Sequence, residues 1–225
     1  MPLADKLKPP PDRLYGRARG HTLRARQAEL LLHLLPRLRW PDQGFPPTID
    51  DIWLEVGAGS FEHAETIASQ NPTIGLIACE VFENGIASLL SRLAPVGGEG
   101  SLLKNLRVYA GDARALIREL PDCSIGRAFL MFPDPWPKAR HTKRRFVHPM
   151  ILYEMARIMR GGGVWRIASD DPTYQGWVDE IFSQQSEFSV RLRSMVKPAD
   201  WPTTRYEAKA IASGRRPLYW QIERR

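Results

Sequence analysis

Residues 49–60, IDDIWLEVGAGS, decide the fold class of this 225-residue chain. The largely apolar run that ends at Val56 predicts a buried strand. Gly57 and Gly59 follow directly, and glycine permits the tight turn that leads from a strand back into a helix. Residues 61–69 predict that helix. Strand, glycine turn and helix together form the first repeat of an α/β protein.

The same alternation continues along the chain. Further strands are predicted at residues 73–80, 106–110, 128–132 and 164–169. Helices are predicted at residues 22–35, 82–93, 113–120, 146–159 and 174–183, with a glycine turn at residues 161–163. Residues 188–195 and 218–224 predict two last strands, with no helix after the second. Such an order requires a mostly parallel sheet with helices on both faces and right-handed crossovers.

The net charge of +7 is concentrated in two segments. Residues 1–39 carry a net charge of +6, residues 138–145 carry +5, and the rest of the chain sums to −4. Two basic segments on a mildly acidic protein attract polyanions such as nucleic acid, whereas the common alternative is a solvated charged surface. The proline-rich residues 1–20 have no apolar face, so we expect a flexible basic arm that orders on RNA, followed by a single domain over residues 21–225.

Composition excludes several classes of protein. No window approaches the roughly 18 apolar residues of a membrane helix, and the N-terminus lacks the apolar core of a secretory signal. Cys79 and Cys123 are the only cysteines, and their spacing fits neither a metal site nor a disulfide framework. We therefore expect a cytoplasmic protein with reduced thiols, without a metal and without membrane attachment.

Acidic residues accompany the ends of four consecutive predicted strands. Glu55 stands just before the glycine turn, and Glu80, Asp112 and Asp134 follow the next three strands. Ligands of parallel sheets bind at the carboxyl ends of the strands, so these carboxylates describe a pocket. Taken alone, Glu80 is also explained as an exposed acid that opens a helix, and Asp112 as a helix cap.

The glycine turn narrows the choice of ligand. Glu62 replaces the third glycine of a dinucleotide fingerprint, and the lysine of a phosphate-binding loop is absent. A nicotinamide-dependent oxidoreductase is therefore disfavoured. A carboxylate beside the turn repels a pyrophosphate and attracts an ammonium group. S-adenosylmethionine offers such a group, together with a sulfonium and two ribose hydroxyls, so it is the predicted cofactor.

The most unusual stretch is residues 131–146, MFPDPWPKARHTKRRF. Three prolines stiffen the loop that carries Asp134, and five Lys or Arg residues follow it. Trp136 is predicted either to stack on an RNA base or to anchor the loop on the core. We expect the basic run to hold the phosphates of a nucleic acid. His63 shows no evident chemistry at this level.

At this point the chain resembles the bacterial tRNA (guanine-N7-)-methyltransferases, a family of class I S-adenosylmethionine-dependent methyltransferases. The resemblance rests on RLYGRARGHTLRARQ, LEVGAGS, FPDPWPKARHTKRR, ASDD and TTRYEAKA, and it covers nearly the whole chain. It implies a Rossmann-like sheet of seven mostly parallel strands with an antiparallel last strand. Two departures are Phe61, where the family commonly has a small residue, and Tyr206, where it has phenylalanine.

The resemblance also implies roles for individual residues. Asp134 matches the proposed active-site residue, and the cofactor-binding positions are Glu55, Gly57, Gly59, Glu80, Asp112 and Asp134. The positions that contact substrate or RNA are Lys138, Arg140, His141, Thr142, Lys143, Arg144, Arg145, Asp170, Thr204, Arg205, Tyr206 and Glu207.

The implied reaction is methyl transfer to N7 of guanine at position 46 in the variable loop of tRNA, by a monomer or a homodimer. Two alternatives remain open from the residues alone. One is a methyltransferase that acts on another RNA guanine. The other is a non-catalytic RNA-binding module, although strand-end carboxylates would weaken its hold on RNA.

Overall fold

The computed structural model describes residues 18–96 and 102–225. These residues divide into two compact units, residues 18–116 (the N-terminal unit) and residues 117–225 (the C-terminal unit). The predicted basic arm falls largely on residues 1–17, which lie outside the described residues.

Three parallel strands form the sheet of the N-terminal unit: β1 (Asp51–Val56), β2 (Ile74–Cys79) and β3 (Leu106–Tyr109). All six residues of β2 are buried, as expected for a strand covered on both faces. Val56 pairs with Cys79, and Cys79 pairs with Tyr109. The three strands therefore end level with one another, which brings the residues that follow them to the same edge of the sheet.

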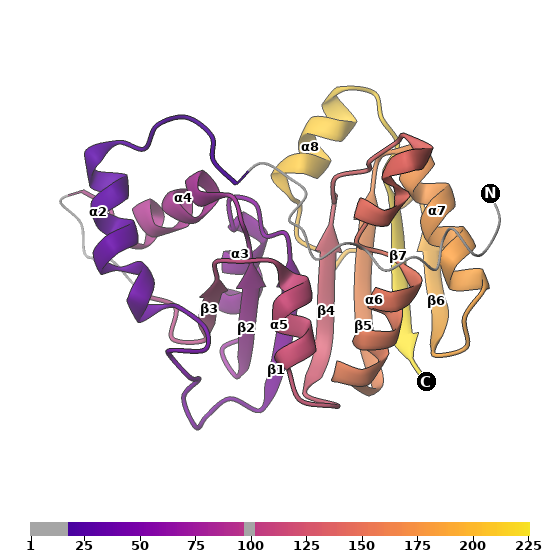
Figure 1. The fold of residues 1–225 in the computed structure, drawn as a ribbon, viewed down its shortest axis with the longest axis horizontal. Coiled ribbons are helices and arrows are strands. Elements are labelled where there is room, and N and C mark those ends of the chain that lie inside the picture. The colour runs from indigo at the N-terminus through magenta and orange to yellow at the C-terminus, as the bar shows by residue number, and fades with distance from the viewer. Residues whose placement is uncertain (1–17, 97–101) are drawn as a thin grey trace. The chain divides into compact units, whose positions relative to one another are not determined.

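Helices α2 (Ala25–His33), α3 (Glu62–Gln70) and α4 (Glu83–Leu93) accompany these strands. Helix α2 packs against α4, as Figure 1 shows. The chain just before α2 is fixed at the start of α4, because Gly20 N donates to Asn84 Oδ1 at 2.8 Å and Glu83 N donates to Ala18 O at 3.0 Å. Residues 18–20, expected in the flexible arm, are thus held in place.

Four strands form the sheet of the C-terminal unit: β4 (Ile125–Met131), β5 (Met159–Ser169), β6 (Phe188–Ser194) and β7 (Leu218–Arg224). β4 and β5 are parallel, and β7 lies between β5 and β6, antiparallel to both (Figure 1). The seven strands follow the order β3-β2-β1-β4-β5-β7-β6. The predicted fold class, including the antiparallel last strand, is confirmed.

Helix α6 (Pro149–Ile158) begins three residues later than the periodicity predicts. His148 stands before it in an extended conformation, and its Nδ1 accepts a hydrogen bond from Met150 N at 3.4 Å. Proline favours the first helical position because it has no N–H to lose there. The chain from Phe146 to His148 is consequently not helical. Helix α7 (Pro172–Ser183) is capped by Asp171, which accepts from Tyr174 N at 3.0 Å.

The glycines at residues 161–163, predicted as a turn between a helix and a strand, lie inside β5. The pairing with β4 is irregular there: Ile125 faces Met159, but Arg127 faces Val164. Gly162 has a φ of +76°, and a Cβ on Gly163 would come within 2.8 Å of a backbone oxygen. The glycines therefore form a bulge in the strand instead of ending it.

Three elements were not predicted. A 3₁₀ helix, η1 (Leu35–Arg37), follows α2. The basic run folds into a second 3₁₀ helix, η2 (Ala139–Arg144), and residues after β6 form helix α8 (Arg205–Ala212). A local signal for α8 was present in the sequence, because Thr204 and Glu207 have the spacing of a capping box. The structure contains that box: Glu207 N donates to Thr204 Oγ1 at 3.0 Å, and Thr204 N donates to Glu207 Oε2 at 3.3 Å.

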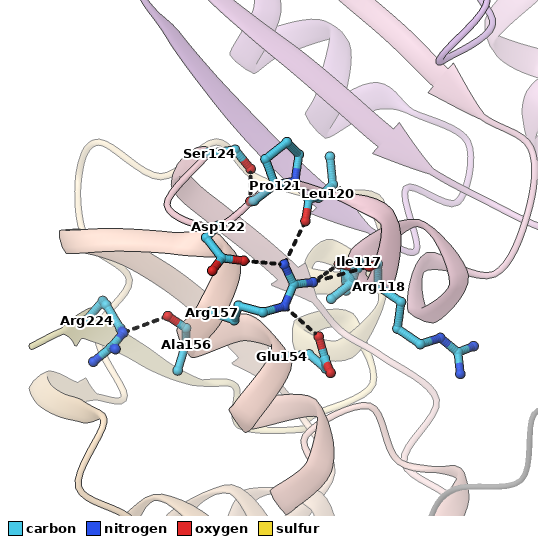
Figure 2. A network of polar contacts seen from close by, with 10 residues as sticks. All are labelled: Ile117, Arg118, Leu120, Pro121, Asp122, Ser124, Glu154, Ala156, Arg157 and Arg224. Atoms are coloured by element: carbon cyan, nitrogen blue, oxygen red, sulfur yellow. Dashed lines mark hydrogen bonds and ion pairs between the residues drawn. The ribbon is translucent and has the colours of Figure 1, made fainter.

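Arg157 ties α6 to the chain ahead of β4 (Figure 2). Its guanidinium donates to the carbonyl oxygens of Ile117 and Leu120, both at 2.7 Å, and forms ion pairs with Asp122 and Glu154 at 2.8 and 3.0 Å. Ile117 belongs to helix α5 (Ala113–Glu119), whose last carbonyls have no partners within the helix. A cation at this end satisfies them and complements the helix dipole.

Candidate functional site

The glycine turn after β1 is held in a conformation that suits glycine. Gly57 and Gly59 have φ values of +73° and +59°. The amide groups of Gly57 and Ala58 both donate to Cys79 O at 3.0 Å, which fixes the turn to the end of β2. A Cβ on Gly57 would meet nothing within 4 Å, so this side of the turn is open. At Gly59 the turn is closely packed by α4, because a Cβ on Gly85 would lie 2.0 Å from Gly59 O.

Phe61 occupies the third left-handed position of the turn, with a φ of +68°. Its side chain is completely buried, so the ring is part of the core. The backbone at this position has the conformation of a glycine. Phe61 therefore replaces the small residue of the resemblance without filling the open side of the turn at Gly57.

Glu55 and His63 form a buried pair beneath the turn. The Nδ1 atom of His63 lies 3.0 Å from Glu55 Oε2, and the exposed fractions of the two side chains are 6% and 3%. His63 comes from the second residue of α3, whereas Glu55 is the penultimate residue of β1. The histidine without evident chemistry thus contacts the first of the predicted cofactor acids. Sequence reasoning missed this contact because eight residues and a turn separate the two.

Glu80 accepts hydrogen bonds from three backbone amides. Gly59 N donates to Oε2 at 2.5 Å, and Val81 N and Phe82 N donate to Oε1 at 2.7 and 2.8 Å. The side chain is only 9% exposed. The carboxylate therefore links the end of β2 to the glycine turn. The alternative that Glu80 is an exposed acid is wrong, and its contact with the cofactor stays a prediction.

Asp112 stands directly before α5 and acts as its cap, since Arg114 N donates to Oδ1 at 3.0 Å. The alternative considered from sequence, helix capping, is thus present. The carboxylate also lies 3.4 Å from the Arg114 guanidinium. The cap fixes the orientation of the Asp112 carboxylate, which still stands just after the end of β3 with the other predicted cofactor acids.

Cys79 shows that the three acids gather at one place. Its thiol is buried, and its pKa is raised well above the ordinary value, first by burial and then by the negative charges of Glu80, Glu55 and Asp112. The carboxylates at the ends of these three strands therefore all lie close enough to act on the same thiol. An open glycine turn beside clustered acids fits the amino group and hydroxyls of S-adenosylmethionine, and disfavours a phosphate.

In the C-terminal unit, the loop after β4 holds Asp134 between two strained residues. Phe132 and Trp136 have φ values of +54° and +43°, each directly before a proline. Left-handed conformations of non-glycine residues cost about 1–3 kcal/mol each and persist only where the surroundings enforce them. Phe132 N donates to Ala168 O at 2.8 Å, which anchors the start of the loop to β5. Asp134 itself is exposed to solvent.

Trp136 is held by the basic run that follows it. Arg144 lies over the indole ring at 4.8 Å, and the ring of His141 meets its edge at a centroid distance of 5.8 Å. Partial burial and then the charges of Arg144, Arg140, Lys138 and Lys143 lower the pKa of His141. Trp136 therefore packs against side chains of its own loop, and both roles predicted for it, stacking on an RNA base and anchoring the loop on the core, stay predictions.

The cations of the run differ in exposure. Lys138, Arg140 and Lys143 are exposed, and His141, Thr142 and Arg144 are half-buried. Arg145 is buried, with 3% of its surface exposed. Its Nε donates to Pro135 O at 3.1 Å and its Nη2 to Trp136 O at 3.0 Å. The expectation that Arg145 contacts RNA therefore conflicts with its burial among protein groups.

Asp170 follows β5 and pairs with Arg215 at 2.7 Å. Its side chain is 15% exposed, so the pair is partly withdrawn from solvent. Arg215 was not among the predicted site residues. It lies after α8, far from Asp170 in sequence, and no local pattern signals the contact.

The predicted substrate residues 204–207 separate into two kinds. Thr204 and Glu207 are buried in the capping box of α8, and Glu207 also accepts from Tyr219 Oη and lies 3.4 Å from Lys197 Nζ. Glu207 is therefore held inside the protein and is not an exposed surface group. Arg205 and Tyr206 are exposed. A cavity of about 350 Å³ lies at Glu207, lined by Met195, Lys197, Thr203, Glu207, Ile211, Arg215, Arg216, Pro217 and Tyr219.

Within residues 18–96 and 102–225, no cluster of three His, Cys, Asp or Glu side chains has the geometry to hold a metal ion. In the same part of the chain, every helix is too short or too polar to cross a membrane.

Comparison with known proteins decides the family. A family model described as a putative methyltransferase matches residues 50–219. The tRNA (guanine-N(7)-)-methyltransferase of Granulibacter bethesdensis is 55% identical over 97% of this chain and 98% of the relative. The protein of the same name from Paramagnetospirillum magneticum is 45% identical over 95% of this chain and 93% of the relative.

The chain belongs to the tRNA (guanine-N7-)-methyltransferase family.

The resemblance seen in the sequence is thereby confirmed, and every predicted site residue of this family member falls within the matched residues 50–219. Among solved structures, the 16S rRNA methyltransferase KamB is similar with a TM-score of 0.58 at 17% identity, over 81% of this chain and 96% of that one. At that identity the likeness supports the methyltransferase fold alone.

Proposed function

We propose that the protein transfers a methyl group from S-adenosylmethionine to N7 of guanine in tRNA, at position 46 of the variable loop. The proposal rests on membership of the family over nearly the full chain. The geometry that supports it is an exposed carboxylate, Asp134, on an anchored loop that runs directly into the exposed cations Lys138, Arg140 and Lys143.

The cofactor belongs at the glycine turn of the N-terminal unit. When bound there, S-adenosylmethionine supplies an activated methyl group. Glu80 and Asp112 receive its hydroxyls and polar edge, and Glu55 attracts its amino group. His63 holds Glu55 in place, and the three amides that donate to Glu80 hold that carboxylate against the turn.

The acceptor chemistry needs no general base. Guanine N7 has a free lone pair and no proton to remove, so a carbon–nitrogen bond forms as the carbon–sulfur bond breaks. Most of the work is therefore alignment of N7 with the methyl group. The guanine ring gains positive charge during transfer, and the fixed carboxylate of Asp134 stabilises that charge more than mobile water does. Asp134 also accepts hydrogen bonds from N1 and N2 of the base.

The exposed cations hold the RNA backbone. Lys138, Arg140 and Lys143 bind phosphates beside the target nucleotide and carry little sequence information. Asp170 is proposed to assist at the base, once a substrate competes with its ion pair to Arg215. Arg205 and Tyr206, both exposed on α8, make further contacts with tRNA in this proposal.

The test is methyl transfer from radiolabelled S-adenosylmethionine to two unmodified tRNA transcripts, with guanine or adenine at position 46. Label in the guanine transcript alone is the expected result. Label in both would refute the site assignment, and label in neither, with cofactor binding retained, would point to another RNA.

A second experiment tests the role of Asp134. Asp134→Asn should lower kcat by about 10²–10³, the usual loss for one preorganised electrostatic contact, with little change in tRNA affinity. Asp42→Asn, at another exposed acid, is the matched control and should keep full turnover. An Asp134→Asn enzyme with normal kcat would remove the electrostatic role.

A further inference from the structure

Arg145 is the last cation of the basic run, yet it does not face solvent. Its side chain is 3% exposed, while Lys143, two residues earlier, is exposed. The guanidinium donates to two neighbouring carbonyl oxygens, those of Pro135 and Trp136, at 3.1 and 3.0 Å. A buried arginine that binds backbone carbonyls through its planar fork acts on the loop that carries them.

Helix α7 fixes Arg145 from the other side. The guanidinium carbon lies 4.9 Å from the ring centroid of Trp177, in a cation–π contact. The same tryptophan donates from Nε1 to Val147 O at 2.5 Å, and Val147 N donates to Tyr174 Oη at 3.4 Å. Tyr174 is fully buried and Trp177 is 5% exposed. The chain on the C-terminal side of Arg145 is thus locked to α7 by two side chains.

The loop needs such a hold. Phe132 and Trp136 adopt left-handed backbone conformations, which are unfavourable for bulky side chains. Asp134 lies between them, and the two carbonyls bound by Arg145 follow Asp134 at once in the chain. The direction of the Asp134 carboxylate therefore depends on where Pro135 and Trp136 are held, and Arg145 holds both.

We propose that Arg145, stacked on Trp177, is a positioning residue that sets the orientation of Asp134 and does not itself bind RNA. The proposal rests on the proposed function, since Asp134 matters only if the loop faces the reacting guanine. It divides the basic run by role: the exposed cations Lys138, Arg140 and Lys143 serve tRNA affinity, and Arg145 serves turnover.

Arg145→Lys separates the two roles. Lysine keeps the charge but has no fork to bridge two carbonyls. Because a shift of about 1 Å in a positioned group costs about 10²-fold in rate, kcat should fall at least about tenfold, with the Kd for tRNA within about threefold of wild type. Lys143→Gln, which removes an exposed cation of the same run, should weaken tRNA binding more than Arg145→Lys does. A variant Arg145→Lys with weakened tRNA binding and normal kcat would overturn the proposal.

A second readout needs no activity. Trypsin cleavage after Lys138 in the full chain without tRNA should be faster in Arg145→Lys than in wild type, and unchanged in Lys143→Gln. If wild type methylates no tRNA but this difference appears, the proposed function fails and the hold on the loop stands. If wild type is active and Arg145→Lys matches it in both kcat and cleavage rate, the hold is refuted.

Trp177→Phe covers the case in which Arg145→Lys does not fold. Phenylalanine keeps a ring beneath the guanidinium but cannot donate to Val147 O. It should reduce kcat less than Arg145→Lys, in the same direction, and leave tRNA affinity unchanged. A Trp177→Phe enzyme that melts earlier but keeps wild-type kcat and loop cleavage would show that these contacts are only structural.

Discussion

Glu80→Gln tests the cofactor half of the site most directly. The carboxylate accepts from Gly59 N, Val81 N and Phe82 N at 2.5–2.8 Å. Glutamine has one oxygen in place of two, and its NH₂ group cannot accept. At least one of the three amides must therefore lose its partner, and the others exchange a charged acceptor for a neutral one.

The magnitude follows from those contacts. A hydrogen bond to a charged group contributes about 1.5–3 kcal/mol, and Glu80 is buried, so solvent screens little of this. We expect the free energy of unfolding to fall by about 2 kcal/mol, which lowers the melting temperature by about 4–8 °C in a chain of this size. Affinity for S-adenosylmethionine should fall about 10–100-fold, since 1.4 kcal/mol corresponds to a factor of ten.

Calorimetric titration with S-adenosylmethionine and urea denaturation measure the two effects. Glu83→Gln is the matched control, because Glu83 lies three residues later, is 41% exposed and has Arg19 at 3.7 Å; it should change stability by less than about 0.5 kcal/mol. Unchanged cofactor affinity in Glu80→Gln would refute the cofactor role. Unchanged stability would refute the account of the three amides.

Three further predictions concern the scaffold. Burial alone would raise the pKa of Asp179, but hydrogen bonds from Arg193 and Trp220 outweigh burial and lower that pKa. The carboxylate therefore stabilises the fold above its unfolded pKa of about 3.9, and this stabilisation is lost as the pH falls through the folded pKa. Asp179→Asn should consequently lose less stability than wild type below about pH 4, and urea midpoints that change with pH in parallel for the two proteins would contradict this. Iodoacetamide at pH 8 should label the exposed Cys123 and spare Cys79, because burial and neighbouring acids raise the pKa of the Cys79 thiol. Peptide mass spectrometry measures the labelling of each cysteine in the folded protein, and equal rates would contradict the prediction. Arg157→Met removes the partner of the α5 carbonyls and of two acids, and urea denaturation should show a loss of about 2–4 kcal/mol; a loss below about 0.5 kcal/mol would mean that water replaces those contacts.

Local patterns predicted much of the fold. Apolar runs of strand length and helical periodicity reflect burial on one or two faces, so they mark elements wherever packing follows local propensity. Errors arose where a second contact decided the outcome. The glycines at residues 161–163 form a bulge because β4 pairs on both sides of them. The late start of α6 is a different kind of error, because His148 and Pro149 set its first turn and were a local signal that the apolar periodicity alone did not reveal.

The candidate site divides in the same way. The sequence alone determined that carboxylates stand at the ends of parallel strands, because strand direction and the order of elements place them there. Only the tertiary structure decided which of these groups are exposed and which are held. His63 pairs with Glu55, and Arg215 with Asp170, because helices and turns fold back over the strand ends. Arg145 and Lys143 are alike in sequence, but α7 presents Trp177 to Arg145 and leaves Lys143 in solvent. Burial is a property of the elements that pack on a residue, and those lie too far away in the chain for any local pattern to encode.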